Sequence, residues 1–215
     1  MTPSVLNWKE INSRIAGRAQ LVAVSKTLNV EEIEPVLIAG QRLFGENRVQ
    51  EAQSKWPELR LRYPDVELHL LGPLQSNKVS EAVAVFDVIQ TIDRPKIATA
   101  LAAEMKIQNR HLPCFVQVNI GREPQKAGVA PHDLQEFLKH AVQDLGLNII
   151  GLMCIPPVAE NPRPYFQELA RMAKQNGLKQ MSMGMSNDFE EAIAEGASFV
   201  RVGSAIFGGR PQITR

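Results

Sequence analysis

A lysine directly behind the first strongly apolar run of the sequence has the clearest chemical potential. Lys26 follows residues 21–24 (LVAV) and Ser25, so we expect a strand to hold its stem at the edge of a sheet, partly out of water. Partial removal from water lowers the pKa of an ammonium and leaves a neutral amine that can attack an aldehyde. A lone lysine after a strand more often extends into solvent, so Lys26 becomes informative only together with other residues.

Two loops rich in glycine and serine lie near the other end of the chain. Residues 182–186 (SMGMS) precede one expected helix, and Gly203-Ser204 precedes a short helical segment at 205–207. Backbone N–H groups, hydroxyls and the positive end of a helix dipole favour an anion such as phosphate at these positions. Either loop alone could simply cap a helix, but both together with a strand-end lysine favour a phosphate site. Arg201 is either a cation at that site or an outward, solvated charge.

Eight short apolar runs alternate with stretches of helical periodicity at 30–39, 94–103, 132–142, 164–176 and 187–195. This alternation implies a parallel sheet covered by helices. Eight such units close into a barrel, whereas six or seven would favour an open sheet. We therefore predict one α/β domain over residues 1–215, a single (β/α)8 TIM-type barrel with an additional N-terminal helix at 8–18. The expected strands are 21–24, 42–44, 66–71, 86–91, 114–119, 149–153, 179–181 and 198–202.

The ends of several helices are marked by residue type. Asp93 before Arg94 and Pro95 resembles an N-cap with an early proline. Asn187 is expected to cap a helix, with Glu190 completing a capping box. Glycines fall where helices should end, at Gly40, Gly146, Gly177 and Gly196. In such a barrel the carboxyl ends of the strands share one rim, which brings Lys26 to the same side as the two serine loops.

Composition excludes several classes of partner. The chain has 24 basic and 23 acidic side chains and a formal net charge of +1, so we expect neither nucleic acid nor an anionic membrane as a partner. No apolar run approaches the roughly 18 residues needed to span a bilayer, and the N-terminus lacks the layout of a signal peptide. We expect a cytoplasmic protein. Cys114 and Cys154 are expected to be small buried hydrophobes, and no metal site is expected.

Five motifs, in the same order and over nearly the whole chain, resemble those of the pyridoxal-phosphate homeostasis proteins. These proteins, of the YggS/PROSC type, are relatives of the alanine racemase N-terminal barrel. The departure is Pro73, which stands where the family pattern has a histidine. The motifs are residues 22–26 (VAVSK), 44–47 (FGEN), 71–78 (LGPLQSNK), 182–186 (SMGMS) and 200–208 (VRVGSAIFG).

The resemblance implies that pyridoxal 5'-phosphate (PLP) is held as a Schiff base on Lys26. It further implies that Ser182 and the Gly203-Ser204 loop hold the phosphate and that Arg201 lies against the pyridine nitrogen or the phosphate. An arginine at the pyridine nitrogen disfavours the pyridinium that carbanion chemistry needs. The implied cofactor-binding residues are Lys26, Asn47, which would line the ring, Met153, Ser182, Arg201, Gly203 and Ser204.

A racemase needs a second base opposite the lysine, and the racemase relatives take it from an additional domain and a partner subunit. The sequence ends at Arg215, and neither Tyr63 nor Tyr165 falls at a strand end. The leading hypothesis is therefore a non-enzymatic, monomeric carrier that buffers or delivers PLP and so influences amino-acid and keto-acid balance. Its other partners would be transient PLP-acceptor enzymes or a regulatory protein.

Two enzyme hypotheses stay open. One is a PLP-dependent enzyme of narrow specificity that acts on amino acids with Lys26 as its only base. The other is a barrel enzyme without cofactor that uses Lys26 as a Schiff-base aldolase lysine. Lys126 is a rival lysine in a polar segment, where we expect a solvated side chain, and a secondary or transfer role for it stays open.

Overall fold

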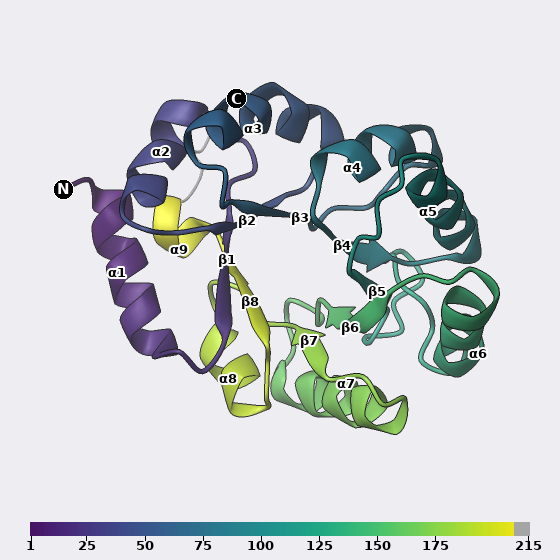
Figure 1. The fold of residues 1–215 in the computed structure, drawn as a ribbon. Coiled ribbons are helices and arrows are strands. Elements are labelled where there is room, and N and C mark those ends of the chain that lie inside the picture. Colours follow the sequence, from purple (N-terminus) through teal and green to yellow (C-terminus); the bar gives the residue numbers. More distant parts are fainter. Residues whose placement is uncertain (209–215) are drawn as a thin grey trace, which may run out of the picture.

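Eight parallel strands close into a barrel in the computed structural model, which describes residues 1–208 (Figure 1). Each strand pairs with the next along the chain, and β8 returns to pair with β1. The predicted barrel is thus confirmed. The strands are β1 Gln20–Val24, β2 Leu43–Glu46, β3 Glu67–Leu70, β4 Val88–Ile92, β5 Cys114–Val118, β6 Ile149–Cys154, β7 Gln180–Ser182 and β8 Phe199–Val202.

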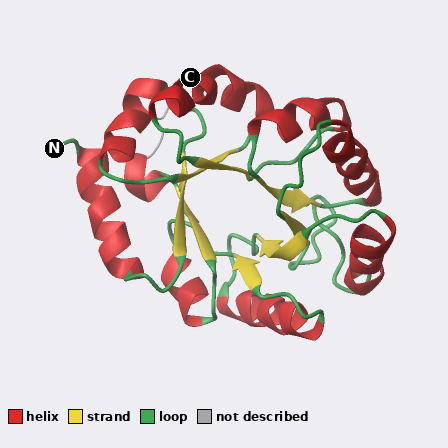
Figure 2. Cartoon of the chain, viewed as in Figure 1, coloured by secondary structure: helices red, strands yellow, loops and turns green. Residues whose placement is uncertain are grey.

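Helices form a ring around the strands (Figure 2). They alternate with the strands along the chain, as the periodicity predicts, and α1 precedes β1 as the additional N-terminal helix. Within residues 1–208, none of the helices combines the length and apolar character that crossing a membrane requires. The helices are α1 Pro3–Ile15, α2 Val30–Ile38, α3 Val49–Arg62, α4 Val79–Val85, α5 Pro95–Ile107, α6 Leu134–Lys139, α7 Arg163–Gln175, α8 Phe189–Ala194 and α9 Ser204–Phe207, with a 3-10 turn at Ser76–Lys78 and a π-helical turn at His140–Asp144.

Several predicted helix boundaries are wrong. Helix α1 begins at Pro3 rather than at residue 8, because a proline is well suited to a first helical turn. Asp93 and Asn187 are not the N-cap residues. The N-cap of α5 is Arg94 and that of α8 is Asp188, and the side chains of Arg94 and Asp188 make no capping hydrogen bond. The four predicted helix-ending glycines are confirmed by positive φ angles, from +68° at Gly146 and Gly177 to +113° at Gly40.

Helices α3 and α4 do not stand out in the sequence pattern. On α3 the buried face includes Lys55 as well as Trp56 and Leu59, and a buried lysine breaks the apolar periodicity on which such a prediction depends. Pro57 lies inside the same helix, where a proline normally argues against one.

Four strands end later than predicted, β2 by two residues and β4, β6 and β7 by one, and in β2 and β7 this changes where the last residues point. Strand β2 runs to Glu46 and β7 runs to Ser182, both of which we expected in loops. Because side chains alternate across a strand, β2 directs Phe44 and Glu46 outward onto α3, where Phe44 packs on Trp56 with ring centroids 5.0 Å apart. Gly45 lies on the inner face, where a Cβ would be 2.3 Å from Leu71 Cδ1.

The interior of the barrel is part apolar and part polar. One apolar cluster fills it, with partly buried side chains packed around it. Polar side chains of β3, β4, β7 and β8 are also fully or almost fully buried, so a hydrogen-bonded network can form in the interior. The buried members of the apolar cluster are Val22, Val88, Phe115, Met153 and Phe199.

Candidate functional site

The turn that carries Lys26 follows β1 at the carboxyl rim of the barrel. Lys26 is exposed, so the prediction that the strand end holds its stem partly out of water is wrong. Thr27 next to it has a φ of +66°, the left-handed region that β-branched residues rarely adopt. Strand β8 lies directly beside β1, and a Cβ on Gly203 would be 3.0 Å from the carbonyl oxygen of Val24. The Lys26 turn and the Gly203 loop are therefore neighbours on the rim.

The two serine-rich loops meet at Ser186. The hydroxyl of Ser204 donates to Ser186 Oγ at 3.0 Å, and the backbone N–H of Ala205 lies 3.3 Å from the same oxygen. Ser204 is exposed and Ser186 is half-buried, so both hydroxyls can be reached from the rim. Helices α8 and α9 are short, so the groups that these loops offer to an anion are hydroxyls and amides rather than helix dipoles.

Ser186 is absent from the predicted site residues although it ends the SMGMS motif. The loop before it turns sharply at Gly184, which has a φ of +90°. A Cβ there would lie 2.5 Å from the Cβ of Ala192, so no other residue fits. This turn separates Ser182 on the strand from Ser186 on the loop, and the sequence pattern alone does not distinguish their positions.

Arg201 points into the barrel, which decides between the two orientations left open by the sequence. Its side chain is 4% exposed, and its guanidinium donates to Ser182 Oγ at 2.7 Å and to the carbonyl oxygen of Cys154 at 2.9 Å. Burial lowers the pKa of this guanidinium from its ordinary value, although arginine stays protonated in proteins. Other N–H groups of Arg201 make no hydrogen bond to the described residues.

Ser182 is fully buried, and both functions of its hydroxyl are occupied. It accepts from Arg201 and donates to Gln90 Oε1 at 2.5 Å. A serine hydroxyl carries one proton, so Ser182 has none left to donate to a phosphate. The structure therefore places Ser182 beneath the rim as a partner of Arg201, apart from the Ser186 and Ser204 hydroxyls.

The polar chain continues across the barrel to β3. The side-chain amide nitrogen of Gln90 lies 2.7 Å from His69 Nδ1, and His69 Nε2 lies 2.7 Å from Glu67 Oε1. The hydrogen bond with His69 lowers the pKa of the Glu67 carboxyl. Each buried side chain in this hydrogen-bonded row thus has a partner. Together these partners fix the positions of Ser182 and Arg201. The sequence analysis missed Gln90 and His69; a polar residue in the inward register of an apolar strand is the signal that marks them.

Asn47 and Met153 flank the rim in different ways. Asn47 is half-buried after β2, and its carbonyl oxygen would lie 2.1 Å from a Cβ on Gly72. Only glycine at position 72 allows the loops after β2 and β3 to come this close. Met153 is fully buried in the interior cluster on β6, so it lies below the rim.

The remaining sequence predictions have mixed outcomes. Lys126 is half-buried and pairs with Glu123 Oε2 at 2.5 Å, so its side chain is less solvated than predicted. Both cysteines are buried as predicted, and burial raises the pKa of each thiol to about 12. Residues 1–208 contain no group of three or more His, Cys, Asp or Glu side chains that could hold a metal ion.

The rim as a whole suits a phosphorylated aldehyde. Ser186 Oγ accepts from the Ser204 hydroxyl and from the Ala205 N–H. This leaves the proton of Ser186 to be donated outward at the rim, where an anion would bind. Below these groups lies the buried guanidinium of Arg201, which has N–H groups without a partner among residues 1–208, and the exposed Lys26 lies in the turn after the neighbouring strand. A primary amine forms a Schiff base with an aldehyde, so the donor set and the amine together fit a molecule such as PLP.

Comparisons with known proteins relate the whole chain to a family. The sequence model of the family "Alanine racemase, N-terminal domain" matches residues 6–211. The pyridoxal phosphate homeostasis protein of Vibrio cholerae is 40% identical over 223 residues, covering 98% of this chain and 93% of that protein. The corresponding protein of Aquifex aeolicus is 38% identical over 208 residues, covering 91% of this chain and 90% of its own length.

Solved structures extend the comparison. PipY of Synechococcus elongatus, solved with PLP bound, superposes with a TM-score of 0.87 at 37% identity, covering 95% of this chain and 100% of that chain. The alanine racemase of Bartonella henselae, at 17% identity and a TM-score of 0.76, shares the fold over 98% of this chain but only 61% of its own.

Proposed function

The chain belongs to the family of the alanine racemase N-terminal domain, and from this premise we propose that it binds PLP and acts in PLP homeostasis. The observation that carries the proposal is the meeting of Ser186, Ser204 and the Ala205 N–H beside β1, the strand that the Lys26 turn follows. The relatives named pyridoxal phosphate homeostasis proteins and the PLP-bound PipY structure support the same ligand.

In this proposal, Lys26 holds the aldehyde carbon of PLP as a Schiff base. The phosphate lies on the Gly203-Ser204 loop together with Ser186, which takes the role that the resemblance gives to Ser182. Ser182 instead holds Arg201, whose free N–H groups face the pyridine ring. Asn47 lines the ring from the β2 end, and Met153 supports the site from the barrel interior.

The chemistry of these residues favours carrying PLP over catalysis. Arg201 is a permanent cation, and a cation at the pyridine nitrogen opposes the protonation that makes PLP a strong electron sink. We extend the proposal to residues 1–215 as one PLP-binding domain that is monomeric and cytoplasmic. It would pass the cofactor to acceptor enzymes or answer to a regulatory protein, and so influence amino-acid and keto-acid balance.

The test is a visible spectrum of the purified protein with PLP, followed by borohydride reduction and mapping of the modified peptide. We expect an absorbance band from the Schiff base and a pyridoxyl group fixed on Lys26, both lost in Lys26→Ala. Lys139→Ala on the exposed side of α6 is the matched control and should bind as the wild type does. A pyridoxyl group on another lysine would overturn the assignment to Lys26, and amino-acid turnover that depends on Lys26 would overturn the carrier proposal.

A further inference from the structure

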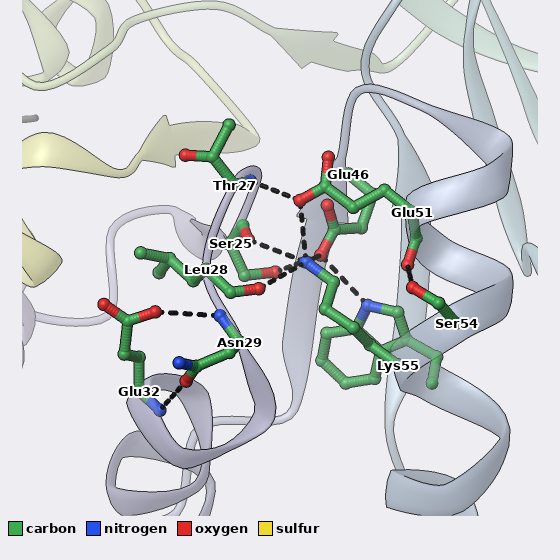
Figure 3. A network of polar contacts seen from close by, with 10 residues as sticks. Ser25, Thr27, Leu28, Asn29, Glu32, Glu46, Glu51, Ser54 and Lys55 are labelled. Atoms are coloured by element: carbon green, nitrogen blue, oxygen red, sulfur yellow. Dashed lines mark hydrogen bonds and ion pairs between the residues drawn. The ribbon is translucent and has the colours of Figure 1, made fainter.

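Lys55 places a buried ammonium directly behind the turn that carries Lys26 (Figure 3). Its side chain on α3 is 6% exposed. It donates to the carbonyl oxygens of Ser25 and Leu28, both at 3.0 Å, and to Glu51 Oε1 at 2.9 Å. It also forms an ion pair with Glu46 Oε1 at 2.8 Å. Lys55 thus binds the backbone of the turn at two points around Lys26.

The residues on both sides of Lys26 are also tied to the carboxylates of this cluster. The hydroxyl of Ser25 donates to Glu46 Oε1 at 2.7 Å. The backbone N–H of Thr27 donates to Glu51 Oε1. Thr27 has a φ of +66°, a conformation that persists only where surrounding contacts hold it. The carboxylate of Glu51 and the ammonium of Lys55 supply those contacts.

A buried charge cluster of this kind is a poor source of stability. Glu46 is completely buried, its Oε2 has no hydrogen-bond partner in the described structure, and its Oε1 also accepts from Trp56 Nε1 at 3.1 Å. Removing such charges from water costs so much that well-packed apolar residues often stabilise a fold equally well or better. The specific effect of the cluster is therefore on the geometry of the turn.

We infer that Lys55, Glu46 and Glu51 are positioning residues that hold the Lys26 turn in the conformation that presents its amine to the aldehyde of PLP. This inference rests on the proposed function. In the linking step the lysine nitrogen bonds to the aldehyde carbon, and the carbonyl oxygen leaves as water with two protons, so no further reactant is needed. None of the three residues touches the anion site formed by the loops after β7 and β8.

The inference separates two ligands that differ in one group. PLP can link to Lys26, whereas pyridoxamine 5'-phosphate has the same ring and phosphate but an amine in place of the aldehyde. If the turn is presented correctly only a tenth of the time, the apparent Kd for PLP rises about tenfold. Binding of pyridoxamine 5'-phosphate does not use the lysine link and should be unchanged. A merely structural role would weaken both ligands together.

The experiment measures the Kd of both ligands for Lys55→Met, Glu51→Ala and Glu51→Gln. Matched controls lie on the same helix, where Arg62→Met and Glu58→Ala remove a cation and an anion from an exposed pair. We expect Lys55→Met to weaken PLP about tenfold and Glu51→Ala to weaken it less. Glu51→Gln should restore most of the affinity, because its Oε1 can still accept from the Thr27 N–H. The controls should bind both ligands as the wild type does.

Three results would overturn the inference. One is PLP affinity in both Lys55→Met and Glu51→Ala equal to that of the wild type, and another is an equal loss of both ligands. The third is failure of Glu51→Gln to restore what Glu51→Ala loses. If Lys55→Met does not fold, the Glu51 pair still decides, because that side chain is 22% exposed and its removal leaves the core intact. Failure of the proposed function is distinct: the wild type itself would then carry no pyridoxyl group on Lys26 after reduction.

Discussion

The two serines of the SMGMS motif should respond in opposite ways to removal of their hydroxyls. Ser186 is half-buried, and its Oγ accepts hydrogen bonds from the Ser204 hydroxyl and the Ala205 N–H. It therefore lies where the phosphate is proposed to bind. Ser182 Oγ is fully buried between Arg201 and Gln90. Ser186→Ala should therefore affect PLP binding, whereas Ser182→Ala should mainly affect folding.

The magnitudes follow from what each hydroxyl contacts. A hydrogen bond to a charged phosphate contributes about 1.5–3 kcal/mol, so Ser186→Ala should raise the Kd for PLP about tenfold to a hundredfold. Ser182→Ala leaves a guanidinium N–H and an amide oxygen buried without a partner. This costs about 1–3 kcal/mol of folding free energy, or a drop in Tm of roughly 2–12 °C for a chain of this size.

Two measurements distinguish the variants: titration with PLP followed by absorbance, and thermal unfolding of the PLP-free protein followed by circular dichroism. Ser186→Ala should unfold at the wild-type temperature, since its side chain is not part of the core. The reasoning is refuted if Ser182→Ala loses more PLP affinity than Ser186→Ala, because the phosphate would then contact the strand residue rather than the loop residue.

Three further predictions concern the surrounding structure. Burial raises the pKa of the Cys114 and Cys154 thiols to about 12, so Ellman's reagent at pH 8 should label neither in the native protein and both in denaturant; rapid native labelling would contradict this. Gly72→Ala puts a Cβ 2.1 Å from the Asn47 carbonyl oxygen. It should lower the free energy of unfolding in urea by about 1–3 kcal/mol and weaken PLP binding, and an unchanged unfolding midpoint would count against this. Burial also raises the pKa of the Glu46 carboxyl above its ordinary 4.5, against the opposing attraction of Lys55. Stability contributed by this group is therefore present below pH 4.5 and lost as pH rises through the raised pKa, so urea unfolding of Glu46→Gln should depend less on pH in that window than the wild type; parallel pH profiles would refute the assignment.

The architecture was predictable because it depends on patterns local to each segment. Alternation of short apolar runs with helical periodicity gave eight strands, and the glycines at Gly40, Gly146, Gly177 and Gly196 marked helix ends through their positive φ angles. The same local signals failed at α3, where Lys55 occupies the buried face. A lysine is assigned to the surface unless its partners are known, and here the partners come from the turn after β1, from β2 and from α3.

The candidate site divides in the same way. The sequence by itself determined that a lysine follows the first strand and that two serine-rich loops follow the last two, since residue type and strand order put all three on one rim. Only the tertiary structure decided that Arg201 points inward and that Ser182 is its buried partner. It also decided that Ser186 rather than Ser182 meets Ser204, and that Glu46 faces α3. The orientations of Glu46, Ser182 and Arg201 depend on which face of a strand each side chain takes, and a shift of one residue in the pairing register would reverse that face. The position of Ser186 depends on the turn at Gly184.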